Sequence, residues 1–454
     1  MKALRALVVS YVFPPVGGAG VQRVLKLVKY LPRHGVTPAV LTALEPSVPL
    51  QDASLEREVP PGTEVLRART FEPGYGAKQL AWQMAAGAPR GPLAKLKHGV
   101  VAFGRSLLVP DPQLLWLPAA HWALARRLLS AQADDVVFIS GPPFSQYLLA
   151  GITRLRRGTA LVLDYRDEWS TTSSAYEMSG SARASALLEK TILRSAHAVT
   201  TATEEFRAAL LARFDFLEPS RVVAIPNGYD SEDFPATLPA PPTDRFVLTY
   251  SGTVFRLTSA AGLLAGVRRL HEREPELAKL LDVRFVGRIV DTEAHHFEGS
   301  DALGVRRLGY VEHDVAIRHL AESHAALCIL DDVAGVERIY PAKIFEIMRV
   351  GRPCLTLTPE GALARLVREH QLGELLSPHD TGGIAAVLEK WLRAFRDQQA
   401  LPLHAPVDVA RFDRKLQAAQ FAAVFRDAHA LASAPHRKRR AGATPVAVRP
   451  ASST

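Results

Sequence analysis

Two residues of opposite charge, Lys343 and Glu346, stand three positions apart in a segment bounded by Pro341 and Gly351. The boundary residues predict a short helix, because proline is favoured in a first helical turn and glycine just beyond the last. A lysine in the first turn opposes the helix dipole unless an anion also binds there. Glu346, one turn further along, could accept hydrogen bonds from two sugar hydroxyls. Read alone, the segment fits a phosphate-plus-sugar site and an ordinary helix with an ion pair equally well.

A glycine-rich turn provides a second candidate phosphate site. It follows an apolar run that begins at Leu4, and it contains Gly17 and Gly18 ahead of a predicted helix over 21–30. Backbone N–H groups in such a strand-to-helix turn can bind phosphate or sugar. The spacing is not Gly-x-Gly-x-x-Gly, so the dinucleotide-binding fingerprint is absent. A turn that needs glycine only for its backbone conformation explains these residues at least as simply.

Polar residues follow two further predicted strands. Directly after the strands predicted over 160–163 and 222–225 stand Asp164, Arg166, Asp167 and Trp169 in the first case and Asn227 in the second. Open α/β sheets bind their ligands at the carboxyl ends of parallel strands, where both groups would lie. A structural ion-pair network is the competing interpretation of 164–169. We favour a functional site, because the cluster includes an aromatic residue and precedes the polar loop 170–174.

The composition favours a globular chain with anionic ligands. The 454 residues include 22% charged side chains and carry a formal net charge of +9, which is typical of a chain of two or three folded domains. The moderate positive excess favours partners such as nucleotides, diphosphates or an acidic membrane face, and it is too small to predict nucleic-acid binding.

Cysteine usage and the lack of long apolar runs indicate a cytoplasmic protein. Cys328 and Cys354 stand in apolar runs without metal-binding spacing, so we expect buried free thiols in a reducing compartment. No apolar run approaches the ~20 residues needed to span a bilayer. Residues 1–10 fit a first strand better than a signal peptide, because no small-residue cleavage site follows them.

The elements that must hold the candidate residues alternate between strand and helix. Apolar runs of strand type recur from Leu4 to Ile225 and again from Phe246 to Thr358, with helical segments between them. This alternation predicts an α/β fold with two Rossmann-like, doubly wound domains. The proline-dense stretch 236–244 is the expected linker. We therefore expect a first domain over 1–235, a second over 245–400, closing helices over 401–432 and a disordered basic tail over 433–454.

One irregular region has two interpretations. The segment 93–108 combines Lys95, Lys97 and Arg105 with apolar residues. We favour a helix that packs on the core and keeps its basic side in water. The alternative is an amphipathic segment that rests on an anionic membrane surface.

Two such domains would face each other across a cleft, and the cleft would suit a ligand made of a nucleotide, a diphosphate and a sugar. Lys343 and Arg256, which follows the first strand of the second domain, would supply two cations for one diphosphate. Fixed cations would stabilise the charge that gathers on a departing diphosphate. The sequence contains no P-loop, metal-binding carboxylate cluster, Ser-His-Asp set or cysteine nucleophile, so no metal or other cofactor is expected.

Five segments in a fixed order carry a resemblance to a known family. They are Phe13-Pro14-Pro15-Val16-Gly17-Gly18, Asp164-Tyr165-Arg166-Asp167-Glu168-Trp169, Ile225-Pro226-Asn227-Gly228-Tyr229-Asp230, Tyr250-Ser251-Gly252, and Pro341-Ala342-Lys343-Ile344-Phe345-Glu346 with Gly351-Arg352-Pro353. From about Val8 to Leu392 the chain resembles the GT-B-fold, retaining glycosyltransferases of family 4. The resemblance implies transfer of a sugar from a nucleotide-sugar donor, held by the second domain, to an acceptor hydroxyl held by the first.

The resemblance also assigns roles to the candidate residues. It implies that Gly17 and Gly18 lie near the donor phosphates, that Arg256 and Lys343 hold the diphosphate and that Glu346 contacts the nucleotide ribose. Asp164, Trp169 and Asn227 would lie on the acceptor side of the cleft.

Three departures from the family pattern bear on catalysis. The family spaces two glutamates with seven residues between them, but Arg338 stands at the first position, so its neighbour Glu337 would have to substitute. Arg166 and Asp167 stand where many members have a histidine, a variation that we associate with enzymes acting on surface polysaccharide or lipid-linked intermediates. Thr253 replaces a usual arginine. The expected catalytic residues are therefore Arg166, Asp167 and Glu337.

The leading hypothesis is a glycosyltransferase that works at the cytoplasmic face of the membrane on a sugar or lipid-linked acceptor, in surface-polysaccharide or glycolipid synthesis. A nucleotide-sugar epimerase of the same architecture is one alternative, and it would interconvert sugars without an acceptor. A non-catalytic nucleotide-sugar-binding protein is the other, and it would bind without turnover and without dependence on Glu346.

Overall fold

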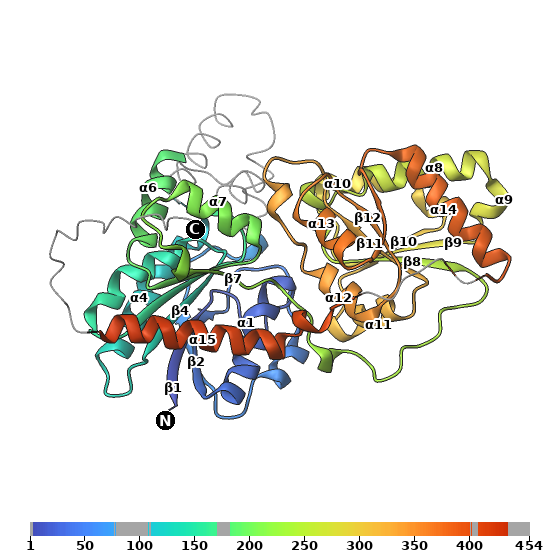
Figure 1. The fold of residues 1–454 in the computed structure, drawn as a ribbon. Helices are drawn as coiled ribbons and strands as arrows, with labels where there is room; N and C mark the ends of the chain where they lie inside the picture. The colour runs from blue at the N-terminus through green and yellow to red at the C-terminus, as the bar shows by residue number, and fades with distance from the viewer. Residues whose placement is uncertain are drawn as a thin grey trace, which may run out of the picture.

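The computed structural model describes residues 3–76, 110–169, 182–399 and 407–434, with the single residues 78, 108 and 401. Figure 1 shows two α/β domains side by side, each built on one sheet. The predicted segment 93–108, the polar loop 170–174 and nearly all of the predicted tail over 433–454 lie outside the described residues.

The first sheet is parallel throughout, with strand order β3-β2-β1-β4-β5-β6-β7. Its strands are β1 (Leu4–Val9), β2 (Val36–Leu44), β3 (Glu64–Arg69), β4 (Val136–Gly141), β5 (Ala160–Tyr165), β6 (Ala198–Thr201) and β7 (Val222–Ala224). Alternate residues of β1 enter different cores, because successive side chains of a strand point to opposite faces. Ala6 and Val8 enter one core, and Leu7 and Val9 enter the other. Both faces must therefore be covered by helices.

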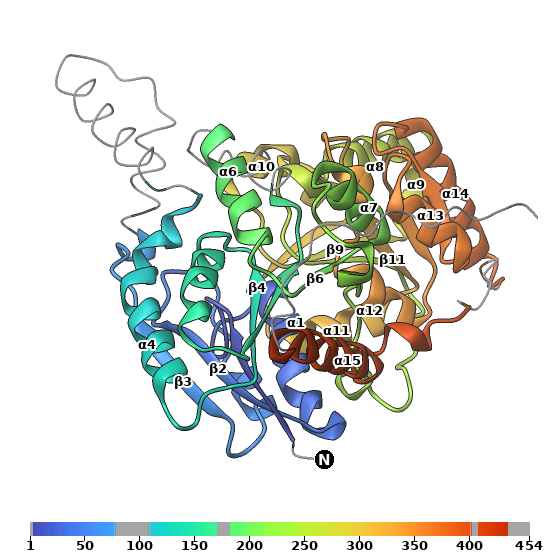
Figure 2. The same cartoon turned by 60° about the vertical axis from the view of Figure 1, so that its left-hand side comes forward.

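Helices from both ends of the chain cover the first sheet. One face packs on α1 (Ala19–Tyr30) and α15 (Arg414–Ser433), and the other packs on α4 (Leu117–Leu129), the 3-10 segment η4 (Ser145–Leu155), α6 (Ala182–Leu193) and α7 (Glu204–Arg213). The last helix therefore returns to the first domain. Figures 1 and 2 show α15 running along α1 there, far in sequence from the elements that it covers.

The second sheet is also parallel, with strand order β10-β9-β8-β11-β12-β13. Its strands are β8 (Phe246–Ser251), β9 (Leu281–Val286), β10 (Val305–Gly309), β11 (Ala325–Ile329), β12 (Cys354–Leu357) and β13 (Gly373–Leu376). Two helices, α8 (Ala261–Arg273) and α14 (Thr381–Arg396), pack on one face. The other face packs on α11 (His313–Ala321), α12 (Lys343–Val350) and α13 (Ala362–Glu369). Two one-turn helices, α9 (Pro275–Ala278) and α10 (Asp291–Ala294), complete this domain.

The predicted fold class, two Rossmann-like α/β domains, is confirmed. Neither sheet includes a residue of the expected linker 236–244. The helix that carries Lys343 begins at that lysine rather than at Pro341, and it ends as predicted at Gly351, which is left-handed at φ 70°. Sequence periodicity missed β3, α11, α13 and β13. No helix in the described ranges has the length and apolarity needed to cross a membrane.

Candidate active site between the domains

A cavity of about 600 Å³ lies between the two domains, where the carboxyl ends of both sheets meet. Its lining includes Gly18, Arg166, Asp167 and Asn227 from the first domain and Gly252, Arg288, Tyr310, His313, Lys343 and Glu346 from the second. Predicted donor-side and acceptor-side residues that stand far apart in the sequence therefore share one cavity. This is the position at which open α/β sheets bind ligands.

Lys343 is the first residue of α12 and points its ammonium toward the end of β8. Its Nζ lies 3.5 Å from the centroid of the Tyr250 ring, and a Cβ atom on Gly252 would lie 3.0 Å from that Nζ. Gly252 therefore leaves room for the lysine and for a ligand beside it. Burial lowers the pKa of Lys343 to about 8, since desolvation disfavours the charged form. A bound anion would restore the charge.

Glu346 lines the same cavity one turn further along α12, beside a histidine that the sequence analysis did not single out. The Nε2 atom of His313 lies 4.0 Å from Oε1 of Glu346 and 3.2 Å from Oδ2 of Asp233. Burial raises the pKa of Glu346. Burial lowers the pKa of His313, but the hydrogen bond to Asp233 and the charges of Glu346 and Asp233 raise it overall. Glu346 and His313 therefore place a carboxylate and a cationic partner at the position that the sequence analysis assigned to ribose contact.

The predicted second cation, Arg256, does not lie in the cavity. It begins a 3-10 turn, Arg256–Thr258, with its side chain exposed, and it is not among the lining residues. Arg288 takes that place at the end of β9. Val254 donates its N–H to the carbonyl of Arg288 at 2.8 Å, and Gly252 donates to Val286 at 2.8 Å. These bonds hold Arg288 next to the Gly252 turn, which also faces Lys343. The signal in the sequence was an arginine directly after a glycine at a strand end.

Gly17 and Gly18 form a turn in direct contact with the second domain. A Cβ atom on Gly17 would lie 2.1 Å from the hydroxyl oxygen of Tyr310, so no other residue fits there without movement. Gly18 has φ 94°, in the region that glycine adopts at little cost. Burial raises the pKa of Tyr310, whose hydroxyl also faces the N–H of Gly18. The turn is therefore closed against the second domain.

Asp164 lies behind the cavity rather than on its acceptor side. Its carboxylate is fully buried and accepts two hydrogen bonds from Arg23, at 2.8 and 3.0 Å, one from Ser140 and one from Thr200, both at 2.7 Å. Burial raises its pKa, but the charge of Arg23 and these bonds lower it overall. Because every lone pair is engaged, Asp164 holds the strand ends together.

Arg166 and Asp167 do reach the cavity. The guanidinium of Arg166 is nearly buried and donates to the carbonyls of Gly20, Pro142 and, at 3.1 Å, Gly141. Burial lowers its pKa, and these bonds fix the loops around the first sheet. Asp167 is half-buried, and its carboxylate makes no hydrogen bond within the described residues, while burial raises its pKa. Asp167 therefore places a carboxylate at the first-domain wall of the cavity.

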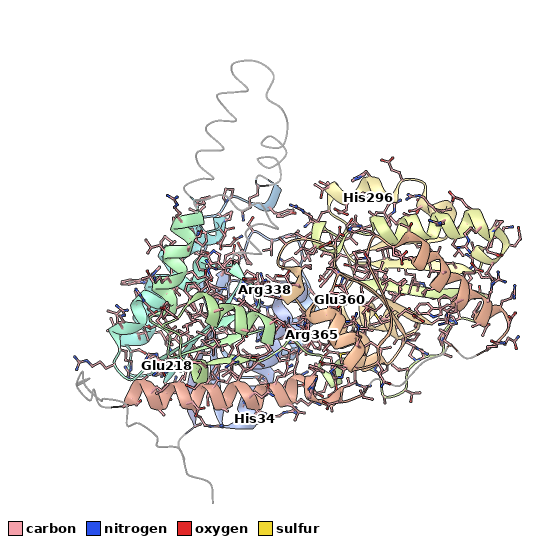
Figure 3. The ribbon with its side chains drawn as sticks, turned by 45° about the horizontal axis from the view of Figure 1, so that its top comes forward. His34, Glu218, His296, Arg338, Glu360 and Arg365 are labelled. Atoms are coloured by element: carbon pink, nitrogen blue, oxygen red, sulfur yellow. The ribbon has the colours of Figure 1, made fainter. Side chains whose placement is uncertain are left out.

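The sequence analysis placed Trp169 on the acceptor side of the cleft and Glu337 among the catalytic residues, but neither residue lines the cavity. Trp169 stacks on Phe144, with ring centroids 5.0 Å apart, and serves the first core. Glu337 pairs with Arg338, which also bonds Glu168 of the first domain through Nη2 at 2.8 Å. Figure 3 shows Arg338 where the two domains meet. The position that the family gives to a glutamate therefore forms an ion pair between domains.

A buried cluster next to the site resembles a metal site in composition. The carboxylates of Glu58, Asp230 and Asp233 converge, but they surround the ammonium of Lys26 at 2.5, 2.9 and 2.5 Å. Lys29 bonds Asp230 and Glu58 as well. Two lysines thus neutralise the carboxylates, so the cluster works as an ion-pair network that joins α1 to the segments 53–58 and 230–233.

Two Rossmann-like domains whose strand ends face a shared cavity define the GT-B fold of glycosyltransferases. Residues 17–228 match the family described as glycosyl transferase 4-like domain. Residues 17–228 therefore form a glycosyl transferase 4-like domain, and the chain as a whole has the GT-B fold. A comparison with curated protein sequences finds no match.

Solved structures share the fold over almost their whole length. Anabaena Alr3699/HepE in complex with UDP and glucose has a TM-score of 0.58 at 15% identity, covering 92% of this chain and 98% of its own. Sucrose-phosphate synthase from Thermosynechococcus elongatus has a TM-score of 0.60 at 15% identity, with coverage of 94% and 100%. A putative UDP-N-acetylglucosamine 2-epimerase from Listeria monocytogenes has a TM-score of 0.52 at 13% identity, with coverage of 93% and 96%.

Proposed function

We propose that this protein is a retaining glycosyltransferase that moves a sugar from a nucleotide-sugar donor to an acceptor hydroxyl. The observation that carries the proposal is the shared cavity, in which Lys343, Arg288 and Glu346 line the second-domain wall and Gly18 and Asp167 the first-domain wall. Cations beside a carboxylate match a diphosphate beside a ribose. Similarity to the UDP complex of HepE supports a nucleotide sugar as the donor.

Each group has a role in the transfer step. Lys343 and Arg288 would bind the diphosphate and stabilise the charge that develops as its bond to the sugar breaks, without a metal. Glu346 would accept hydrogen bonds from the ribose, with His313 beside it. The acceptor oxygen forms the new bond to the sugar carbon, and Asp167 would accept its proton. A pKa raised by burial makes that carboxylate a better base.

The acceptor and the place of the reaction are also part of the proposal. We assign the acceptor to surface polysaccharide or glycolipid synthesis and the reaction to the cytoplasmic face of the membrane. Support comes from the Arg166-Asp167 pair, which lines the first-domain wall of the cavity and which we associate with enzymes acting on surface polysaccharide or lipid-linked intermediates.

A donor screen tests the proposal. Purified protein is incubated with a panel of nucleotide sugars, with and without lipid or oligosaccharide acceptors, and products are measured by mass spectrometry. We expect transfer or slow donor hydrolysis with one nucleotide sugar, and loss of both in Lys343→Ala. Arg256→Ala is the matched control, because Arg256 is exposed outside the cavity. A panel without any donor turnover would contradict the proposal.

A nucleotide-sugar epimerase is the second candidate, because one neighbour of the same fold is a putative epimerase. The same screen separates the two functions. An epimerase would change the sugar of the free nucleotide sugar when no acceptor is present, whereas a transferase would release the nucleoside diphosphate.

A further inference from the structure

Large apolar side chains are exposed on one side of the first domain. Five that are more than half exposed belong to α4 and its neighbours: Phe71, Trp122, Leu129, Leu155 and Leu187. Trp122 and Leu129 are 70% and 71% exposed, and they lie seven residues apart, on the same side of α4. Single exposed apolar residues are ordinary, whereas several gathered on one side of a domain mark a site of contact with a partner or a membrane.

The elements that carry these side chains form one continuous face. η4 packs against both α4 and α6. Arg156, at the end of η4, donates to the carbonyls of Leu128 and Ser130 at 3.3 and 3.2 Å, so it lies beside Leu129. Phe71 donates its N–H to Leu115, just before α4. In Figure 1, α4 and α6 lie on the side of the first domain away from the second. The second domain therefore leaves this face open.

The same face is basic. Exposed arginines stand between the apolar side chains, at positions 126, 154, 156 and 157, and α6 adds Arg183 and Lys190. Neither α4 nor η4 contains an Asp or Glu. The acidic residue of α6, Glu189, is buried and pairs with Arg213 at 3.1 Å. The arginines at 126, 154 and 157 make no ion pair within the described ranges.

We propose that the face formed by α4, η4 and α6 docks on the surface of an anionic lipid bilayer. Apolar side chains that protrude between arginines match the two parts of such a surface, in which acyl chains lie beneath anionic headgroups. The docking itself does not depend on the proposed transfer reaction.

Vesicle flotation of the full chain tests the docking. We expect binding to vesicles of phosphatidylcholine with phosphatidylglycerol, weakened by salt, and little binding to phosphatidylcholine alone. Replacing Arg126, Arg154 and Arg157 together with serine should weaken binding about a hundredfold, at roughly fivefold per charge. The pair Trp122→Ser and Leu129→Ser should weaken it at least tenfold.

Matched variants outside the face give the control. Leu416→Ser changes an exposed leucine on α15, and the pair Arg269→Ser and Arg318→Ser removes exposed charges from the second domain. Both should bind as the wild type does. Equal loss in these controls, equal binding to neutral vesicles or no vesicle binding at all would overturn the proposal.

Two measurements address other occupants of the face. The first is the molar mass from light scattering after gel filtration. A wild-type dimer that the pair Trp122→Ser and Leu129→Ser converts to a monomer would overturn the proposal. A melting temperature lowered by the same pair would also overturn it, since the face would then be covered by this chain itself. An unchanged mass and melting temperature with lost vesicle binding would support lipid docking.

Discussion

Nucleoside diphosphate affinity should depend on pH through Lys343. Burial holds the pKa of this lysine at about 8 in the free protein, whereas the terminal phosphate of a diphosphate is ionised above pH 7. Only the protonated lysine attracts the diphosphate. Its protonated fraction falls from about nine tenths at pH 7 to about one tenth at pH 9, so affinity should fall roughly tenfold, or about 1.4 kcal/mol. The loss begins as pH rises through 8, because the depressed pKa removes the charge there.

Calorimetric titration from pH 7 to 9 measures this effect. At pH 8, titrations in buffers of different ionisation enthalpy should show an uptake of about half a proton per diphosphate bound. Lys343→Arg keeps its charge over this range, so its affinity should not change with pH. His313→Gln should retain the wild-type slope, because it leaves the titrating lysine in place. A flat wild-type profile, or an unchanged slope in Lys343→Arg, would refute the assignment of the diphosphate to Lys343.

Three further predictions follow from the same geometry. Arg288→Ala should weaken nucleoside diphosphate binding by about 10- to 100-fold, which is the effect of losing one charge-assisted hydrogen bond. Arg256→Ala is the control and should change the affinity less than twofold. If calorimetry shows the reverse order, Arg256 rather than Arg288 is the second cation. Gly17→Ala should abolish donor turnover, because the new Cβ would lie 2.1 Å from the Tyr310 hydroxyl. Adding Tyr310→Phe removes that hydroxyl and should restore part of the activity. If activity does not recover, this contact is not the cause of the loss. Arg23→Met leaves its buried carboxylate partner unpaired, so it should cost about 3–5 kcal/mol of unfolding free energy by denaturant titration, and a cost below about 1 kcal/mol would contradict a tight pair.

The sequence was sufficient for the parts of the fold that depend on local pattern. The strands of continuous apolar residues, such as β4 and β5, are buried on both faces, and such strands are easily recognised. β3 (Glu64–Arg69) was missed because it is an edge strand whose residues are mostly half-exposed or exposed. The short β13 lies at the edge of the other sheet. Edge strands lack the apolar pattern that burial imposes on central ones.

The site was predictable where one helix or turn fixes it. Lys343 and Glu346 share the helix α12, so their spacing alone placed them together. Arg256 was predicted because it is close to Gly252 along the sequence. Closeness along the sequence does not show which residues of the other strands lie at the same end of the sheet. The neighbouring strand β9 brings Arg288 there instead, through the bond from Val254 to its carbonyl. The sequence showed an arginine directly after a glycine at a strand end, but it did not show which strand lies beside β8.

Groups from the first domain and from α15 complete the donor side, so the arrangement of the domains acts directly on Glu346. Asp233, at the end of the 3-10 turn Ser231–Asp233, bonds both His313 and, at 2.5 Å, the buried Lys26 of α1. Arg414, where α15 begins, is buried and lowers the pKa of Glu346 by its charge. Moving the domains apart would take Asp233 from His313 and Arg414 from Glu346. The carboxylate proposed to accept the ribose hydroxyls is thus positioned by groups from both ends of the chain, so donor binding and domain closure should favour each other.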